Sequence, residues 1–413
     1  MRILHLVHQY PPEFVGGTEL YTQTLARGLA GRGHPAAVFT RSYVPRAGAH
    51  EWDDHGVPVY AASAGAAGPT QRFLATFGES TLAAAFGQAL DHFQPDLVHV
   101  QHLMGLPGAT LDLLRARGLP YVVTLLDFWW FCANAQLVTN FDHTVCAGPA
   151  WWTNCTRCAV ARSGTPLAWA AAPLLWPLLA QRGRRLHAGL AGAARCLATT
   201  EFVKQIYVGQ GMPPDHVQVV TWGVDAPPDL PRRPAGDRRG PLQIAYIGGV
   251  AWQKGLHVLV DAVSRLPGEC ELWLAGDLEI DREYAQRLAA MAGPGVHFLG
   301  RLGRDQVWEL LAQVDVVAVP SLWYETFSLL AHEAYAAGAP VVASNLGVLA
   351  QVVHHEVDGL LVPTGDVAAW EATLHRLATS PELIAALRRQ ITPPLTVDQH
   401  VDRVLEVYEQ VAT

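Results

Sequence analysis

One apolar run and the segment after it constrain the fold more than any other part of this sequence. Residues 314–320 (VDVVAVP) have the length and composition of a strand that is buried on both faces of a parallel sheet. The polar loop that follows gives way to a helix of small residues. The turn at residues 338–340 ends this helix before a second apolar strand at 341–344. This order of strand, loop, helix and strand predicts a doubly wound α/β domain.

The same unit predicts where a ligand binds. In open parallel sheets, ligands bind at the carboxyl ends of strands, where a helix N-terminus offers N–H groups and a positive dipole to an anion. Phe327, Ser328 and Leu329 would supply these N–H groups. Glu325 precedes them, and Glu333 follows about two helical turns later. Two carboxylates would repel a phosphate that they touched, so we expect them to bind hydroxyls of the same ligand. A phosphate flanked by hydroxyls describes a nucleotide sugar.

The spacing Glu325-x7-Glu333, with the residues 326–329 (TFSL) between them, resembles the signature of the family-4 retaining glycosyltransferases. The resemblance implies the GT-B fold, in which two Rossmann-like doubly wound domains face a central cleft and a C-terminal helix crosses back to the first domain. It implies that Glu325 and the amides of Thr326, Phe327, Ser328 and Leu329 hold the donor sugar and diphosphate, and that Glu333 binds the ribose. An isolated pair of glutamates at this spacing is more often a feature of a helix surface, but the flanking strand and helix favour a site.

A strand-to-helix turn at residues 247–255 (IGGVAWQKG) provides the rest of the predicted donor site. It resembles the family segment G-R-x4-K-G, whose arginine and lysine hold the diphosphate. Lys254, one of two lysines in the chain, matches the lysine, whereas Gly249 stands at the position of the arginine. Arg301, which ends a predicted strand of the same sheet, could compensate in part. The alternative for Lys254 is a solvated lysine at a helix start.

The first half of the chain contributes two further features. Gly16 and Gly17 follow the first predicted strand, and paired glycines let backbone approach a ligand closely. In the family, similar loops face the donor phosphates; a simple turn is the alternative. The resemblance also places a histidine in a T-x-H-[DT] segment, where this chain has Leu126. Since the leucine side chain has no hydrogen-bonding group, the catalytic candidates in addition to Glu325 are Asp127 and His102, which ends the preceding predicted strand.

Length and composition set the domain organisation. A chain of 413 residues exceeds a single core, and its formal net charge of −8 argues against a general nucleic-acid binder. We predict an N-terminal acceptor domain at 1–225, a linker rich in proline, glycine and charge at 226–240, a nucleotide-sugar domain at 241–395 and a returning helix at 396–413. The N-terminus reads as a first strand without a basic signal region, so we expect a cytoplasmic protein.

Four of the six cysteines lie in a predicted insertion at about 129–160: Cys132, Cys146, Cys155 and Cys158. In a reducing compartment, such a set favours tetrahedral Zn²⁺ ligation over disulfides, and four closed ligands would make the zinc structural. Free thiols remain an alternative, because the spacing of the first two cysteines is irregular. Catalysis itself is expected to need no metal, since Lys254 and helix amides would neutralise the leaving group.

An apolar stretch at 166–185 contains two tryptophans, several prolines and adjacent arginines. It is too short and too interrupted to span a bilayer. It could lie in a membrane interface on the cytoplasmic face, or it could be an apolar flap over the first domain or the acceptor. The membrane interpretation favours a lipid-linked acceptor.

The resemblance thus implies a retaining hexosyltransferase that moves a sugar from a nucleoside-diphosphate sugar to a hydroxyl of a glycan, lipid-linked or small-molecule acceptor. Two other functions stay open. A GT-B nucleotide-sugar epimerase would need acid and base groups at the sugar. A non-catalytic nucleotide-sugar binder is suggested by Gly249 and Leu126 together.

Overall fold

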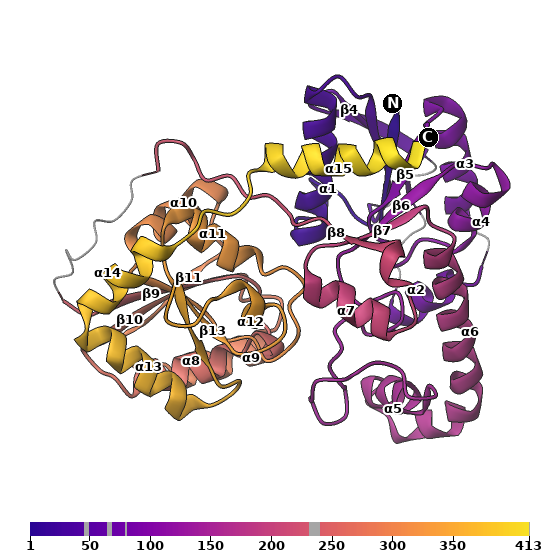
Figure 1. Ribbon diagram of the computed structural model, residues 1–413. Coiled ribbons are helices and arrows are strands. Elements are labelled where there is room, and N and C mark those ends of the chain that lie inside the picture. Colours follow the sequence, from indigo (N-terminus) through magenta and orange to yellow (C-terminus); the bar gives the residue numbers. More distant parts are fainter. Residues whose placement is uncertain (45–48, 64–67, 79–80, 231–239, 413) are drawn as a thin grey trace. The chain divides into compact units, whose positions relative to one another are not determined.

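The computed structural model describes residues 1–44, 49–63, 68–78, 81–230 and 240–412, and it divides into two compact units (Figure 1). Unit 1 combines Met1–Trp222 with Val397–Thr413, and unit 2 is Gly223–Thr396. Most of the predicted linker, residues 231–239, lies outside the described residues. Each unit is described by itself below.

Unit 1 is built on an eight-stranded sheet. Its strands are β1 (Ile3–Val7), β2 (Ala36–Ser42), β3 (Ala49–Asp54), β4 (Val57–Ser63), β5 (Leu97–Val100), β6 (Tyr121–Leu125), β7 (Arg195–Ala198) and β8 (Val217–Val219). The strand order is β3-β4-β2-β1-β5-β6-β7-β8, and every neighbouring pair is parallel except β3 and β4. The predicted doubly wound sheet is therefore confirmed. The antiparallel β3 was not predicted, because its sequence AHEWDD is rich in charge, which suits an exposed edge strand.

Helices cover this sheet (Figure 1). They are α1 (Gly17–Gly31), α2 (Pro69–Ala75), α3 (Thr81–Phe93), α4 (Ala109–Ala116), α5 (Thr153–Arg162), α6 (Ala172–Ala191), α7 (Glu201–Gly209) and α15 (Val397–Ala412), with 3₁₀ turns η1 (Pro166–Ala171) and η2 (Pro214–His216). The apolar stretch at 166–185 is mostly helical: Pro173 lies in the first turn of α6, where no N–H is needed, and only Pro177 lies inside it. Among the described residues, no helix is both long and apolar enough to cross a bilayer.

The last helix, α15, packs in unit 1. A Cβ at Gly28 of α1 would lie 2.7 Å from the Val401 side chain, so the two helices are in close contact. Arg32 donates to Asp398 and Asp402 of α15, each at 2.9 Å. The helix therefore returns to the first unit, as the GT-B fold requires.

Unit 2 contains a six-stranded parallel sheet. Its strands are β9 (Leu242–Ile247), β10 (Cys270–Ala275), β11 (Val296–Gly300), β12 (Val316–Val319), β13 (Val341–Ser344) and β14 (Gly359–Val362). Its helices are α8 (Leu256–Ser264), α9 (Arg282–Met291), α10 (Arg304–Gln313), α11 (Leu329–Ala337), α12 (Leu349–Val352), α13 (Val367–Thr379) and α14 (Pro381–Gln390), with the 3₁₀ turn η3 (Trp252–Lys254).

The order of this sheet, β11-β10-β9-β12-β13-β14, reverses direction between β9 and β12. The chain first adds β10 and β11 on one side of β9 and then adds β12, β13 and β14 on the other. Such a switch point leaves a crevice at the carboxyl ends of the two central strands, which is the usual ligand position in doubly wound sheets. The loop after β9 holds Lys254, and the loop after β12 holds Glu325.

Candidate functional site

The centre of the unit 2 site is an ion pair across the switch point. Lys254 Nζ donates to Glu325 Oε1 at 2.8 Å. The same oxygen accepts hydrogen bonds from Ser321 Oγ at 2.7 Å and from Trp323 Nε1 at 3.1 Å. Lys254 Nζ also lies 5.0 Å from the centre of the Trp323 ring, within cation–π range. Two residues far apart in sequence are thus held together by side chains of one loop.

These contacts keep Glu325 ionised. Burial alone would raise the pKa of Glu325, but the Lys254 ammonium and the hydrogen bonds from Ser321 and Trp323 outweigh it and hold the pKa below its usual value. The side chain of Glu325 is 12% exposed and that of Lys254 is 25% exposed, so a ligand can still reach both.

A glycine fixes the distance between the two loops. Gly255 has φ +71°, and a Cβ at this position would lie 1.9 Å from Pro320 O at the end of β12. Leu322 N donates to Gln253 O at 2.8 Å across the same gap. Only glycine allows the backbones to approach this closely, so Gly255 is a structural requirement of the site.

Helix α11 begins beside Glu325. Ser328, its N-cap, has φ 62° and ψ 72°, an unusual left-handed conformation for a residue other than glycine. The buried Phe327 ring stacks on His332 with centroids 3.9 Å apart, and His332 Nδ1 lies 3.0 Å from Ser328 O. Burial lowers the pKa of His332 to about 4, so this imidazole is neutral and structural. The stacked pair holds the first turn of α11, whose N-terminus can receive an anion.

Glu333 lies in the second turn of α11 and is 4% exposed. It forms an ion pair with Arg304 of α10. Burial raises the pKa of Glu333, and the Arg304 guanidinium offsets part of this effect. The Arg304 guanidinium also lies over the Trp308 ring, at 4.7 Å from its centroid.

Three further residues of the predicted donor set, Gly249, Arg301 and Thr326, also lie in unit 2. No described atom lies within 4 Å of a Cβ built at Gly249, so there is room for the larger side chain that the family has there. Gly248 next to it has φ 155°, a conformation open only to glycine. Arg301 is exposed and directly follows β11. Thr326 lies between Glu325 and Phe327 and is half-buried.

Unit 1 brings together the polar residues that follow three adjacent strands. His102, after β5, lies with Nε2 2.9 Å from Asp127 Oδ2, after β6. Met104 N donates to His102 Nδ1 at 3.1 Å, which leaves the ring proton on Nε2 and makes Asp127 its acceptor. Trp129 N donates to the other Asp127 oxygen at 2.8 Å. The two candidates from the sequence are therefore partners in one hydrogen-bonded pair with a fixed tautomer.

The pair extends toward the loop after β1. The His8 ring lies 4.4 Å from the His102 ring, and His8 Nε2 lies 3.7 Å from Glu19 Oε1. Burial lowers the pKa of His8 and raises that of Glu19. A Cβ at Gly16 would lie 2.6 Å from Glu19 Oε2, so Gly16 makes room for this carboxylate, whereas Gly17 has no described atom within 4 Å of such a Cβ.

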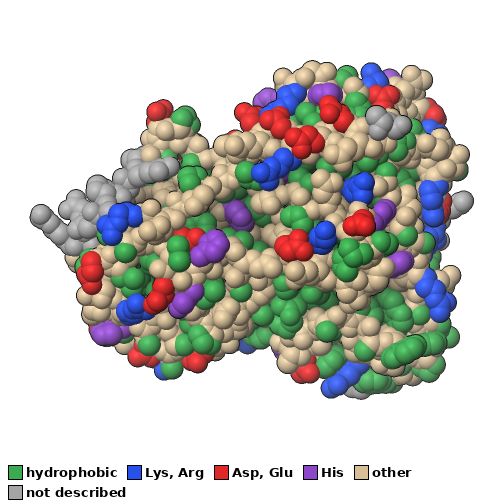
Figure 2. All heavy atoms as spheres, in the orientation of Figure 1, with side chains coloured by type: hydrophobic (Ala, Val, Ile, Leu, Met, Phe, Trp, Pro, Cys, Tyr) green, Lys and Arg blue, Asp and Glu red, His purple; other side chains and the backbone are tan. Residues whose placement is uncertain are grey.

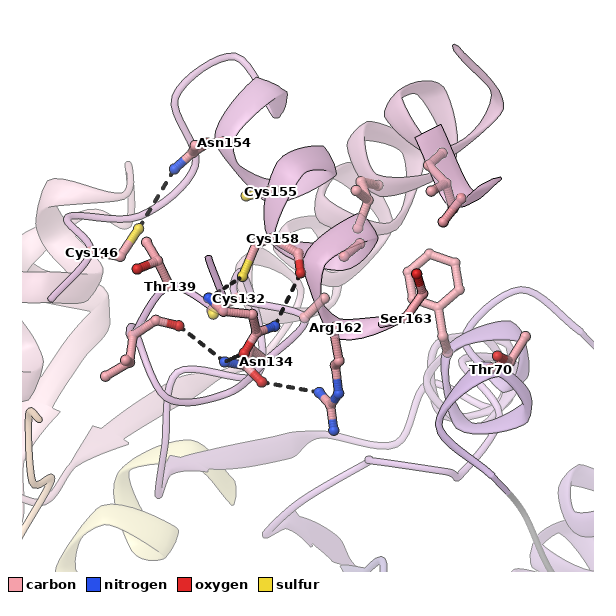
Figure 3. A pocket seen from close by; sticks show the side chains of 18 residues that line it. Thr70, Cys132, Asn134, Thr139, Cys146, Asn154, Cys155, Cys158, Arg162 and Ser163 are labelled. Carbon is pink, nitrogen blue, oxygen red and sulfur yellow. Dashed lines mark hydrogen bonds between the residues drawn. The ribbon is translucent and has the colours of Figure 1, made fainter. Parts of the chain in front are cut away.

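The four cysteines of the insertion line one pocket of about 450 Å³ in unit 1 (Figure 3). All six cysteines of the chain are free thiols in the structure. Within the described ranges, no three His, Cys, Asp or Glu side chains are placed to hold a metal ion as they stand. Burial raises the pKa of Cys132, Cys158 and Cys155, the last to about 12.

Sequence reasoning missed four residues of these sites: Arg304, His332, His8 and Glu19. Arg304 opens α10, and only the packing of α10 on α11 brings it to Glu333. His8 carried a usable signal, because it ends a strand in the same way as His102. His332 is recognised only by its stacking on Phe327, and Glu19 only by its ion pair with His8.

Comparisons with known proteins identify the family. Residues 15–226 match the family described as Glycosyltransferase Family 4, and residues 241–380 match the one described as Glycosyl transferases group 1. The chain is 27% identical over 437 residues to a glycogen synthase of Mycobacterium tuberculosis (strain CDC 1551 / Oshkosh), covering 96% of this chain and 91% of that protein. It is 35% identical over 206 residues to the MMP alpha-(1->4)-mannosyltransferase of Mycolicibacterium hassiacum, covering 48% of this chain.

Solved structures agree on the fold. The sucrose-phosphate synthase of Thermosynechococcus elongatus superposes with a TM-score of 0.72 at 20% identity and covers 99% of this chain and 98% of its own. Anabaena Alr3699/HepE, solved in complex with UDP and glucose, superposes with a TM-score of 0.68 at 20% identity and covers 99% and 100%. Together with the family match over residues 15–226, these findings show that the chain belongs to glycosyltransferase family 4 and is a glycosyltransferase of the GT-B fold.

Proposed function

We propose that the protein transfers a hexose from a nucleoside-diphosphate sugar to an acceptor hydroxyl with retention of anomeric configuration. The observation that carries the proposal is the 2.8 Å Lys254–Glu325 pair beside the N-terminus of α11. A cation, an ionised carboxylate and a helix N-terminus stand together at the switch point of unit 2. These are the groups that a sugar diphosphate needs: positive charge for the phosphates and an acceptor for the sugar hydroxyls.

The donor would use the unit 2 residues as follows. Lys254 and the first amides of α11 would bind the diphosphate, and Glu325 would accept hydrogen bonds from the sugar. Glu333 would accept from the ribose hydroxyls. Arg304, bound to Glu333, would orient that carboxylate and favour its ionised form against the effect of burial. Arg301, which is exposed and directly follows β11, would contact the diphosphate or the nucleobase of the donor.

In the chemical step, the bond between the anomeric carbon and the diphosphate oxygen breaks, and negative charge develops on the leaving diphosphate. Lys254 and the helix N-terminus would stabilise that charge, which is where binding energy lowers a barrier. An oxygen of the leaving phosphate would take the proton of the acceptor hydroxyl. The acceptor oxygen then bonds to the anomeric carbon on the face from which the diphosphate leaves. This route needs no side-chain base at Leu126. The His102–Asp127 pair would hydrogen bond to the acceptor.

The relatives suggest which donor to try first. Anabaena Alr3699/HepE has been solved in complex with UDP-glucose. A UDP-sugar is therefore the first choice, with ADP- and GDP-sugars beside it. The test measures thermal stabilisation by each donor and then release of its diphosphate without acceptor.

The outcomes separate the competing functions. Stabilisation with release of diphosphate supports a transferase, and the anomeric configuration of a product formed with an acceptor, read by NMR, tests retention. Interconversion of one nucleotide sugar into another without acceptor would identify an epimerase. Donor binding without turnover under any acceptor would identify the non-catalytic binder that Gly249 and Leu126 suggest. No binding of any donor would contradict all three.

An exposed apolar surface in unit 1 bears on the acceptor. It consists of Trp151, Leu167, Trp169, Leu174 and Trp176, whose exposed fractions range from 46% at Trp176 to 88% at Trp151. Trp176 Nε1 donates to Trp151 O at 2.7 Å, so α6 and the turn before α5 are joined there. Figure 2 shows hydrophobic side chains gathered over this region of α5 and α6. Large exposed apolar patches usually mark an interaction site.

The charge around this surface favours an anionic membrane as its partner. Residues 143–200 contain six arginines and no aspartate or glutamate, in a chain whose formal net charge is −8. Arg157, Arg162 and Arg184 of this segment are exposed. Tryptophan and leucine beside arginine are the composition of an interfacial membrane contact, and the proposed acceptor is then lipid-linked.

Vesicle sedimentation tests this contact. Binding to vesicles that contain phosphatidylglycerol, and weaker binding to phosphatidylcholine alone, is expected. The double variant Leu167→Ser/Leu174→Ser should lose most of the binding, whereas Ile280→Ser, which removes an apolar residue of unit 2 that is 65% exposed, should not. Equal binding by all three proteins would contradict the proposal.

A further inference from the structure

We propose that Cys132, Cys146, Cys155 and Cys158 bind one structural Zn²⁺ ion as four thiolates, and that the buried Arg182 balances the negative charge of this centre. This zinc centre would take no part in the sugar-transfer reaction. The site lies in the insertion between β6 and α6, which also carries Trp151, Leu167 and Trp169 of the apolar surface.

The four thiols converge from separate parts of the insertion. Cys132 and Cys146 lie in loops, whereas Cys155 and Cys158 lie three residues apart on α5 and therefore share a face of that helix. All four line the same pocket (Figure 3). Residues 129–152 form no helix and no strand beyond the isolated bridge between Val138 and Val145. A segment with so little regular structure gains order from a metal that ties several points of the chain together.

Three N–H groups are directed at the sulfurs, as thiolates require, while Cys146 Sγ also lies 3.5 Å from Gly148 O as a thiol donor and would lose that contact on binding zinc. Gly148 N donates to Cys146 Sγ at 3.4 Å, and Asn154 Nδ2 lies 3.6 Å from the same sulfur (Figure 3). Asn140 N donates to Cys158 Sγ at 3.3 Å. N–H groups directed at sulfur stabilise its ionised form and orient it, as outer-shell partners do in metal sites.

The buried Arg182 suits a negatively charged centre. It is 1% exposed and donates from Nη2 to Trp129 O at 2.7 Å. Its Nη1 is buried and has no hydrogen-bond partner within the described part of the chain. Cys132, Asp127 and Cys155 are near enough to act on the guanidinium electrostatically, so the Asp127 carboxylate supplies part of the compensating charge. A buried cation needs compensating negative charge. A tetrathiolate zinc centre carries net negative charge, whereas two disulfides or four neutral thiols carry none.

Binding requires a small local change. The thiols surround a common pocket, but as they stand no three of them are placed to hold an ion. Zinc would draw each sulfur to about 2.3 Å from the metal. The cavity that the four cysteines line has a volume of about 450 Å³.

Metal analysis of the intact chain, purified under reducing conditions with zinc in the growth medium, is the first test. About one zinc per chain is expected. X-ray absorption should show only sulfur neighbours, at about 2.3 Å. Cys155→Ser and Cys158→Ser should each lose the metal, while Cys196→Ser, which alters a fully buried thiol away from the pocket, should keep it.

Arg182→Met tests the charge balance separately. We expect the metal to pass to a chelator roughly tenfold faster than in the wild type, with the number of thiols unchanged. An unchanged rate would overturn the role of Arg182. Absence of zinc in the wild-type chain, with either six titratable thiols or two disulfides, would overturn the site itself. Because this result comes from the wild-type protein, it holds even if a cysteine variant fails to fold.

Discussion

Replacing Lys254 by methionine should weaken both the stability of unit 2 and its affinity for a nucleoside diphosphate. Methionine keeps an unbranched side chain and removes the ammonium. Glu325 would then keep its bonds from Ser321 and Trp323 but lose its cation. The two effects have different origins, because one concerns the buried carboxylate and the other the phosphates of the ligand.

The magnitude follows from the exposure of the pair. An exposed ion pair contributes less than about 1 kcal/mol, and breaking a fully buried one costs about 3–5 kcal/mol. With side chains 25% and 12% exposed, Lys254 and Glu325 lie between these limits. We expect a loss of about 2 kcal/mol in the free energy of unfolding, or roughly 4–8 °C in the Tm of a unit of this size. Loss of one charged hydrogen bond to phosphate should weaken diphosphate binding by roughly 30-fold.

The pH dependence gives a second readout. The folded protein holds the pKa of Glu325 below its ordinary value of 4.5. The stability from this pair is therefore fully present above pH 4.5 and is lost as the pH falls through the lowered value. The difference in unfolding free energy between the wild type and Lys254→Met should be largest near neutral pH and should shrink in acid.

Calorimetric titration with UDP, GDP and ADP, beside denaturant unfolding, measures both effects. The double variant Lys254→Met/Glu325→Gln is the matched control, since it removes the unpaired charge as well. It should recover most of the lost stability but none of the lost affinity. If Lys254→Met binds its nucleoside diphosphate as tightly as the wild type, Lys254 serves only Glu325 and the donor assignment is wrong.

Three further predictions test other parts of the two units. Glu333→Ala should weaken binding of the ribonucleoside diphosphate roughly 10- to 100-fold and leave the 2′-deoxy analogue much less affected; equal losses for both would refute a ribose contact. Gly255→Ala should cost more than about 3 kcal/mol of unfolding free energy, because its φ is +71° and its Cβ would lie 1.9 Å from Pro320 O, whereas Gly249→Ala on the same loop, with no described atom within 4 Å of its Cβ, should be nearly neutral in denaturant unfolding. Burial lowers the pKa of His5 to about 3, so between pH 6.5 and pH 3 the unfolded chain binds a proton at His5 that the folded chain does not bind. His5→Leu should therefore reduce the fall in unfolding free energy over this range by up to about 1.4 kcal/mol per pH unit. Identical slopes of unfolding free energy against pH in both proteins would contradict this prediction.

Much of the fold could be read from the sequence, because apolar runs of strand length mark buried parallel strands. Residues 341–344 were predicted as a strand and form β13, and the predicted return of the last helix is confirmed by its contacts with α1. The edge strand β3 was not predicted, since its charged residues do not show the apolar pattern of a buried strand. Local signals therefore sufficed wherever an element is buried on both faces.

The candidate site was harder to predict from the sequence than the fold. The sequence pointed to Lys254 and Glu325 separately, but their bond depends on the order of β9 and β12 in the sheet. Arg304 could not be found, because nothing local distinguishes it from the other arginines of a helix start. The His102–Asp127 pair was named as two candidates, and only the adjacency of β5 and β6 makes them one unit.

The return of α15 makes unit 2 an insertion within the sequence of unit 1. Unit 2 is continuous from Gly223 to Thr396, whereas unit 1 needs residues from both sides of it. His99, in the middle of the first sheet, bonds to Tyr408 of α15 at 2.5 Å, so this imidazole lacks that partner until the helix has been synthesised. On the ribosome, unit 2 can therefore complete its core before unit 1 does. A truncation before Val397 would leave the first unit with an open apolar face, the state most exposed to aggregation and proteolysis.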